Sequence, residues 1–106
     1  MGKESILNIV ATECRSEDEA KFNKWYNEVH IPLILKYKGI KRATRYRRMD
    51  ENKQCPTYLA IYEYESKEAL AAHPDSPELA AALKEMNETW KDRMFEIKWM
   101  VPYESI

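Results

Sequence analysis

The stretch from residue 57 to residue 65 constrains the fold of this chain more than any other, because its side chains alternate in character. Leu59 and Ile61 occupy one side, and the other side carries Tyr58, Ala60, Tyr62 and Tyr64. Regular alternation over this length predicts a β-strand whose successive side chains point to opposite faces. A polar turn separates it from residues 41–49, which we predict to be the preceding strand, paired with it as a hairpin.

The rest of the chain adds one strand at each end and two helical regions. Residues 6–14 and 95–101 are apolar and contain β-branched side chains, so we predict the first and last strands there. The resulting order, βαββαβ, is the ferredoxin-like motif. It predicts an α+β fold with a four-stranded antiparallel sheet and helices on one face only.

Helix starts and stops are visible in the sequence. Ser16 and Glu19 have the spacing of a capping box, and Ser66 and Ser76 are typical N-caps. We expect Gly39 to end the first helical segment, since glycine is favoured where φ must be positive. The last helix has a predicted buried stripe of Leu79, Ala82, Leu83, Met86 and Trp90.

The first strand is apolar on both sides. Ile6 and Val10 point one way, while Leu7, Ile9 and Ala11 point the other. A sheet face without helices should be polar unless something covers it. The simplest cover is the same face of a second copy, so we predict a homodimer that buries tyrosine and tryptophan side chains.

The composition indicates one domain over residues 1–106 and excludes several classes of function. The formal net charge of −1 gives no general attraction to nucleic acid or to anionic membranes, and no stretch is apolar enough to span a bilayer. Cys14 and Cys55 form neither a redox pair nor a metal pattern in the sequence. We therefore expect a cytoplasmic protein without a bound metal or cofactor and without nucleic-acid or membrane partners.

A helical stripe of aromatic residues leads to one of the two histidines in the chain. Tyr26 and His30 are four residues apart, and Pro32 predicts that the helix ends close to His30. His30 should therefore face the interior beside a phenol, as a group that titrates near neutrality. The stripe consists of Phe22, Trp25, Tyr26 and Val29.

The block from Trp25 to Pro32, followed by Gly39-Ile40 and Arg45-Tyr46, resembles the EthD-like branch of the dimeric α+β barrel superfamily. The resemblance covers nearly the whole chain. It implies a homodimer whose two sheets close into a barrel, with a pocket between each sheet and its own helices. The superfamily contains cofactor-independent monooxygenases, lactone isomerases, polyketide cyclases, haem-handling enzymes and members with no known reaction, so the fold alone does not fix the chemistry.

Two functions remain open for such a pocket. In an enzyme, His30 is the acid–base group and Tyr26 or Tyr46 orients a hydrophobic carbonyl or phenolic substrate, with residues 31–35 folded over as a lid. In the alternative, His30 only caps the helix end and the protein is a dimeric module that binds a small hydrophobic ligand or a partner protein. We predict Tyr26 and His30 as the catalytic pair.

The predicted substrate-binding residues lie on the aromatic helix and the central hairpin, and they are Trp25, Arg45, Tyr46 and Tyr62. Arg45 could bind a carboxylate or enolate oxygen, or it could simply pair with Glu63 or Glu65 across the sheet. The tyrosines of the third strand could line a pocket, although a dimer interface is the default expectation. We expect His73 to be an exposed turn residue.

Overall fold

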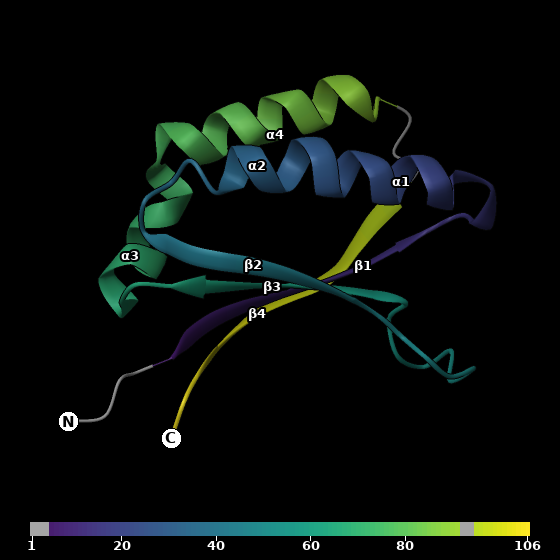
Figure 1. The fold of residues 1–106 in the computed structure, drawn as a ribbon, viewed down its shortest axis with the longest axis horizontal. Coiled ribbons are helices and arrows are strands. Elements are labelled where there is room, and N and C mark those ends of the chain that lie inside the picture. The colour runs from purple at the N-terminus through teal and green to yellow at the C-terminus, as the bar shows by residue number, and fades with distance from the viewer. Residues whose placement is uncertain (1–4, 92–94) are drawn as a thin grey trace.

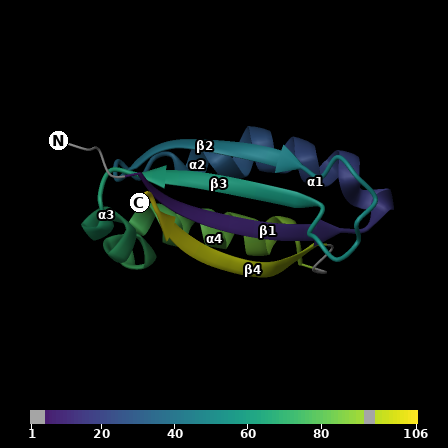
Figure 2. The same ribbon diagram turned by 90° about the horizontal axis from the view of Figure 1, so that it is seen from below.

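The computed structural model describes residues 5–91 and 95–106, and these form one antiparallel sheet covered on one face by helices (Figure 1). The sheet order is β2-β3-β1-β4, as the predicted βαββαβ topology requires. Figure 2 shows β2 and β4 as the two edge strands. The strands are β1 (Ile6–Cys14), β2 (Ile40–Arg47), β3 (Tyr58–Tyr64) and β4 (Phe95–Glu104).

The helices run along one face of the sheet, and the two longer helical segments lie side by side over it (Figure 1). Two short 3₁₀ turns, Ser16–Asp18 and His73–Asp75, precede α1 and α4. The helical elements are α1 (Glu19–Trp25), a π-helical segment (Tyr26–His30), α2 (Ile31–Ile34), α3 (Lys67–Ala72) and α4 (Pro77–Thr89).

The first helix does not end at His30, and this differs from the sequence expectation. It continues through Pro32 to Ile34, because the turn before the proline widens to a π-helix in which the amide of Ile31 donates to the carbonyl oxygen of Tyr26. Pro32 has no N–H to donate and occupies the first turn of α2, where that loss is tolerated. Residues 31–34 therefore extend the helix, and the predicted lid is not present.

Two of the three predicted caps are confirmed. The hydroxyl oxygens of Ser66 and Ser76 accept from the amides of Ala69 and Leu79 and so begin α3 and α4. The predicted capping box at Ser16 is wrong. Residues 16–18 form a 3₁₀ turn without a side-chain cap, in which an ion pair links Arg15 to Asp18.

Gly39 is needed for space and not for a positive φ, which corrects the sequence argument. A Cβ atom at this position would lie 2.5 Å from Cε2 of Tyr37 and 2.8 Å from Cβ of Ala69. The Tyr37 hydroxyl donates to the carbonyl oxygen of Ala69 at 2.7 Å, so the ring that blocks the position is itself held. Gly39 thus lets the turn pack closely against α3.

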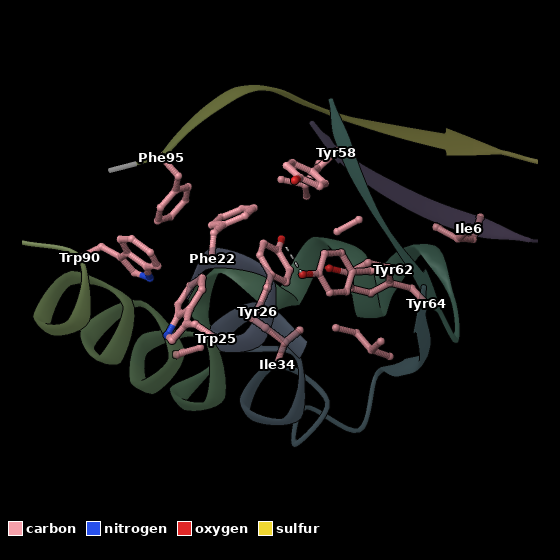
Figure 3. Packing of buried hydrophobic residues seen from close by; sticks show 14 residues of the cluster. Ile6, Phe22, Trp25, Tyr26, Ile34, Tyr58, Tyr62, Tyr64, Trp90 and Phe95 are labelled. Carbon is pink, nitrogen blue, oxygen red and sulfur yellow. Dashed lines mark hydrogen bonds between the residues drawn. The ribbon is translucent and has the colours of Figure 1, made fainter. Parts of the chain in front are cut away.

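The core lies between the helices and the inner face of the sheet (Figure 3). Phe22, 0% exposed, contacts rings from every side, including Phe95 at 5.1 Å and Tyr26 at 5.4 Å between centroids. The tyrosines of β3 point to this side and are buried, so the expectation that they form a dimer interface is wrong. They are Tyr58, Tyr62 and Tyr64.

The outer face of the sheet carries no helix (Figures 1 and 2). The strand register places apolar side chains along β1, β3 and β4 on it. In the antiparallel register Ile9 is flanked by Ile61 of β3 and Val101 of β4, so these three side chains share that face. Trp99 and Tyr103 extend the row along β4 and are 39% and 53% exposed. The predicted apolarity of both sheet faces is thereby confirmed.

Within the described ranges no helix is long and apolar enough to cross a bilayer.

Candidate functional site

A cavity of about 500 Å³ lies between the inner face of the sheet and the helices. This volume is within the range of small-molecule sites. Most of the wall is apolar, with side chains such as Val10, Ile34, Leu70 and Phe95. The polar side chains in the wall are Asn8, Thr12, Tyr26, His30, Tyr62, Tyr64 and His73.

The cavity opens along the edge formed by β4 and α4. Three of its lining residues, Leu83, Ile97 and Met100, are 41%, 48% and 58% exposed, and they belong to these two elements. The rim is therefore apolar. A hydrophobic molecule can enter here without losing polar contacts at the rim.

His30 lies in the cavity wall, at the end of the π-helical segment. Its ring stacks on Trp25 with 4.8 Å between centroids and meets the edge of Tyr26 at 5.0 Å. The side chain is buried, and Nδ1 has no hydrogen-bond partner among the described residues. The π-helical turn that accommodates Pro32 also determines where this ring points.

Burial lowers the pKa of His30 to about 4, with the charge of Glu85 opposing the shift and that of Arg45 adding to it. The expectation that His30 titrates near neutrality is therefore wrong. The free energy lost when a cationic imidazole leaves water is larger than the free energy gained from its attraction to the carboxylate of Glu85. At pH 7 His30 is neutral and has one nitrogen able to accept a proton.

Tyr26 and Tyr62 meet in the cavity wall, where their hydroxyl oxygens are 3.2 Å apart (Figure 3). Burial raises the pKa of both phenols, so both keep their protons at neutral pH. Whichever hydroxyl donates to the other, one phenolic proton remains without an acceptor among the described residues. The pair can therefore donate one hydrogen bond to a molecule in the cavity.

Arg45 reaches from β2 to the first helix and does not line the cavity. Its guanidinium donates to the side-chain oxygens of Asn23 at 2.8 Å and Asn27 at 3.2 Å. It also lies 4.3 Å from the ring centroid of Tyr26. Its charge acts to lower the pKa of Tyr26 and Tyr62, against the larger effect of burial, and so favours negative charge at the cavity wall.

Tyr46, like Arg45, does not line this cavity, and both residues line a separate, smaller pocket. Tyr46 pairs with Leu59, points to the outer face of the sheet and is 53% exposed. Glu63 forms an ion pair with Arg42 at 2.9 Å, so the suggested pairing with Arg45 does not form. Trp25, Tyr26, His30 and Tyr62 are brought together in one wall.

His73 is a cavity residue and not the exposed turn residue expected from the sequence. It is 7% exposed, and its Nδ1 lies 2.6 Å from the hydroxyl oxygen of Tyr64. Its ring stacks on Tyr37 with 4.6 Å between centroids. Leu70 and His73 are three residues apart and both line the cavity, a helical spacing that could have indicated a shared face.

Sequence reasoning also missed the polar groups that support the wall. Glu85 of α4 accepts from the indole N–H of Trp25 at 3.0 Å, and this contact fixes the ring on which His30 stacks. Asn8 and Thr12 alternate with Val10 on β1 and line the cavity. Their spacing of two residues from the inward-facing Val10 was the sequence signal that could have predicted their inward orientation.

Neither cysteine lines this cavity. Burial first, then nearby carboxylates, raise the pKa of Cys14 to about 11, which disfavours a thiolate. Cys55 is exposed in the loop between β2 and β3. In the described part of the chain no three His, Cys, Asp or Glu residues are grouped as metal ligands.

Several solved structures share this fold. HapK from Hahella chejuensis superposes with a TM-score of 0.71 at 14% identity, covering 95% of this chain and 92% of that chain. An ethyl tert-butyl ether d (EthD) family protein from Bacillus halodurans gives 0.69 at 17% identity, covering 95% and 99%. A dimeric protein of unknown function with a ferredoxin-like fold from Bacteroides fragilis gives 0.62 at 15% identity, covering 95% and 94%.

These likenesses define the class: an α+β protein with the ferredoxin-like fold that EthD proteins share, as the sequence resemblance predicted. Residues 5–101 match the family model of a domain of unknown function, DUF4286, and the chain belongs to that family. No curated protein matches the sequence.

Proposed function

We propose that the protein is a homodimer in which each subunit binds a small, mostly apolar molecule in the cavity. We further propose that His30 and the Tyr26–Tyr62 pair act on a carbonyl or phenolic group of that molecule without a cofactor. The observation that carries the proposal is a single apolar wall that contains a neutral histidine and a tyrosine pair with a spare proton. Isomerisation, cyclisation and oxygenation of activated carbonyl or phenol compounds all begin with a proton transfer that such groups can perform.

The charge state of His30 limits the reaction. A neutral imidazole can accept a proton, but a pKa of about 4 makes it a weak base. It suits only a substrate whose proton is already acidic, such as one between two carbonyl groups or on a phenol. An oxyanion that forms beside the ring would raise the pKa of His30, and the same negative charge would accept from the tyrosine pair.

The low pKa also favours the second candidate, a non-catalytic dimeric module that binds a small hydrophobic ligand. In that case His30 and the tyrosine pair serve as hydrogen-bonding groups that orient the ligand. The apolar rim and wall suit either function. The two functions differ in whether a proton leaves the bound molecule.

Solvent hydrogen exchange separates the two functions. The protein is mixed in deuterated buffer with a cyclic β-keto ester, and loss of the signal of the C–H proton between its two carbonyl groups is followed by NMR. The enzyme proposal expects exchange to be faster with the wild type than with His30→Gln, while both proteins bind the compound equally. Equal exchange with the two proteins, with binding retained, supports the module and contradicts the enzyme.

The dimer proposal rests on the outer face of the sheet. Its row of apolar side chains has no helix to cover it, and the Bacteroides fragilis protein of the same fold is described as dimeric. Packing this face on a second copy would remove the exposed ring area of Trp99 and Tyr103 from water. Light scattering at micromolar concentration tests it, because a mass of one chain contradicts the proposal.

A further inference from the structure

The chain has two histidines, and both are buried in the wall of the same cavity. His30 lies beside the Tyr26–Tyr62 pair. His73 lies in the 3₁₀ turn before α4 and contacts Tyr64. Each ring has a nitrogen that is shielded from solvent and without a partner among the described residues, Nδ1 of His30 and Nε2 of His73.

Two residues hold the ring of His73 in place, and a further hydrogen bond holds one of them. Tyr64 is 2.6 Å from Nδ1, Tyr37 stacks on one face at 4.6 Å, and the Tyr37 hydroxyl is itself anchored on the carbonyl oxygen of Ala69. A ring fixed in this way keeps its Nε2 edge on the side opposite to Tyr64, because the two nitrogens lie on different edges of the imidazole. The orientation of Nε2 is therefore already set by these contacts and requires no movement of the 3₁₀ turn that carries His73.

These contacts leave Nε2 of His73 over. Nδ1 and the Tyr64 hydroxyl share one hydrogen bond, whose direction depends on the tautomer of the ring. Nε2 is a donor in one tautomer and an acceptor in the other. Buried polar groups nearly always have a partner, so a nitrogen left over in a cavity wall points to a polar group on the bound molecule.

Tyr62 and Tyr64 are two residues apart on β3 and point to the same face of the sheet. Side chains at this spacing on a strand are roughly 7 Å apart. One tyrosine belongs to the pair beside His30 and the other contacts His73. The cavity therefore has two polar contacts, separated by one repeat of the strand, in a wall that is otherwise mainly apolar.

Given that the cavity binds a ligand as proposed above, we propose that Tyr64 and His73 form its second polar contact. The ligand class is then a mostly apolar molecule with two oxygen groups. One oxygen bonds the Tyr26–Tyr62 pair, and the other forms a hydrogen bond with Nε2 of His73. A ligand with one oxygen fills the cavity but leaves one contact unused.

Two naphthols test this inference, 2-naphthol with one hydroxyl and 2,6-dihydroxynaphthalene with two. Calorimetric titration of the full chain should give a dissociation constant about tenfold lower for the diol, the size of one additional hydrogen bond. His73→Phe keeps an aromatic ring against Tyr37 and should abolish this preference without weakening 2-naphthol binding. Tyr46→Phe, which removes an exposed hydroxyl from the outer face, should retain the tenfold preference.

A second measurement uses only the wild type, so it does not depend on whether a variant folds. Long-range ¹H–¹⁵N NMR of the wild type should show the Nε2 resonance of His73 moving with the diol and not with 2-naphthol. Equal affinity for both naphthols with an unmoved His73 resonance contradicts the second contact alone. If neither compound shifts any resonance of the cavity residues, the proposed function fails as well.

Discussion

The two faces of the sheet are both apolar, yet they differ in what lies among the apolar side chains. The inner face has hydroxyl and imidazole groups beside a cavity, on residues such as Tyr62 and His30. The outer face has a close row of aliphatic and aromatic side chains, represented by Ile9, Ile61 and Val101. A cavity with a few directed polar groups suits a small molecule, whereas an exposed row of apolar side chains suits packing against another protein surface.

The largest expected effect comes from a charge at the centre of the outer face. Ile61→Lys should abolish the proposed dimer, because burying an ammonium against the apolar side chains of a second sheet is costly. Sedimentation should give the mass of one chain, while the protein stays folded by circular dichroism. Ala81→Lys adds the same charge on the exposed side of α4 and should leave the dimer intact. A dimer that survives Ile61→Lys would show that copies do not pair through this face.

The next largest effect concerns the inner face. If the protein is an enzyme, His30→Gln should lower turnover roughly a hundredfold, because glutamine retains hydrogen bonding but cannot accept the proton. The dimer mass and ligand affinity should not change. Unchanged turnover together with a lower melting temperature would mean that His30 has only a structural role.

Burial of His30 should also make stability depend on pH. The pKa is about 4 when folded and 6.5 when exposed, so the unfolded chain binds this proton first as the pH falls. The free energy of unfolding should therefore decrease between about pH 6.5 and pH 4, by at most about 3 kcal/mol from this residue, and not recover below that window. Urea titrations at several pH values measure the free energy of unfolding of the wild type and of His30→Gln, and the variant should lose less stability between pH 6.5 and pH 4. The same pH dependence in both proteins would contradict the burial of His30.

The smallest effect is a matched comparison of two hydroxyl groups. Tyr62→Phe leaves the buried hydroxyl of Tyr26 without its partner and should cost about 1 kcal/mol of unfolding free energy. Tyr46→Phe removes an exposed hydroxyl on the outer face and should change stability by less than about 0.5 kcal/mol in the monomer. Equal effects on denaturant midpoints would remove the distinction between the two faces.

The sequence was sufficient for the order of elements and for the inward side of β3, because alternation and helical spacing are local properties. It was insufficient at Pro32, where a π-helical turn lets the helix continue. It was also insufficient at Gly39, where the ring of Tyr37 leaves no space for a Cβ atom. The rule that proline ends a helix assumes an ordinary α-helical turn, and the close approach of Ala69 to Gly39 joins residues that are distant in the sequence. The same holds for the ion pair of Glu63, which forms with Arg42 and not with Arg45.

The candidate site was predicted in part for the same reason. The helix stripe correctly brought Trp25, Tyr26 and His30 to one wall, since they lie on one continuous helical stretch. His73 was missed because it faces the cavity only through the packing of its turn on Tyr37. The pKa of His30 could not be predicted from spacing, because it reflects how completely the ring is removed from water.

One measurement tests the central claim most directly: the ¹⁵N resonances of His30 recorded from pH 4 to pH 8, without and with 2-naphthol. If the ring is buried in a ligand-binding cavity, it stays a single neutral tautomer above about pH 5, and the naphthol shifts its nitrogen resonances. A ring that titrates near pH 6.5 and does not respond to the naphthol, or to any of the carbonyl and phenol compounds, would contradict the account.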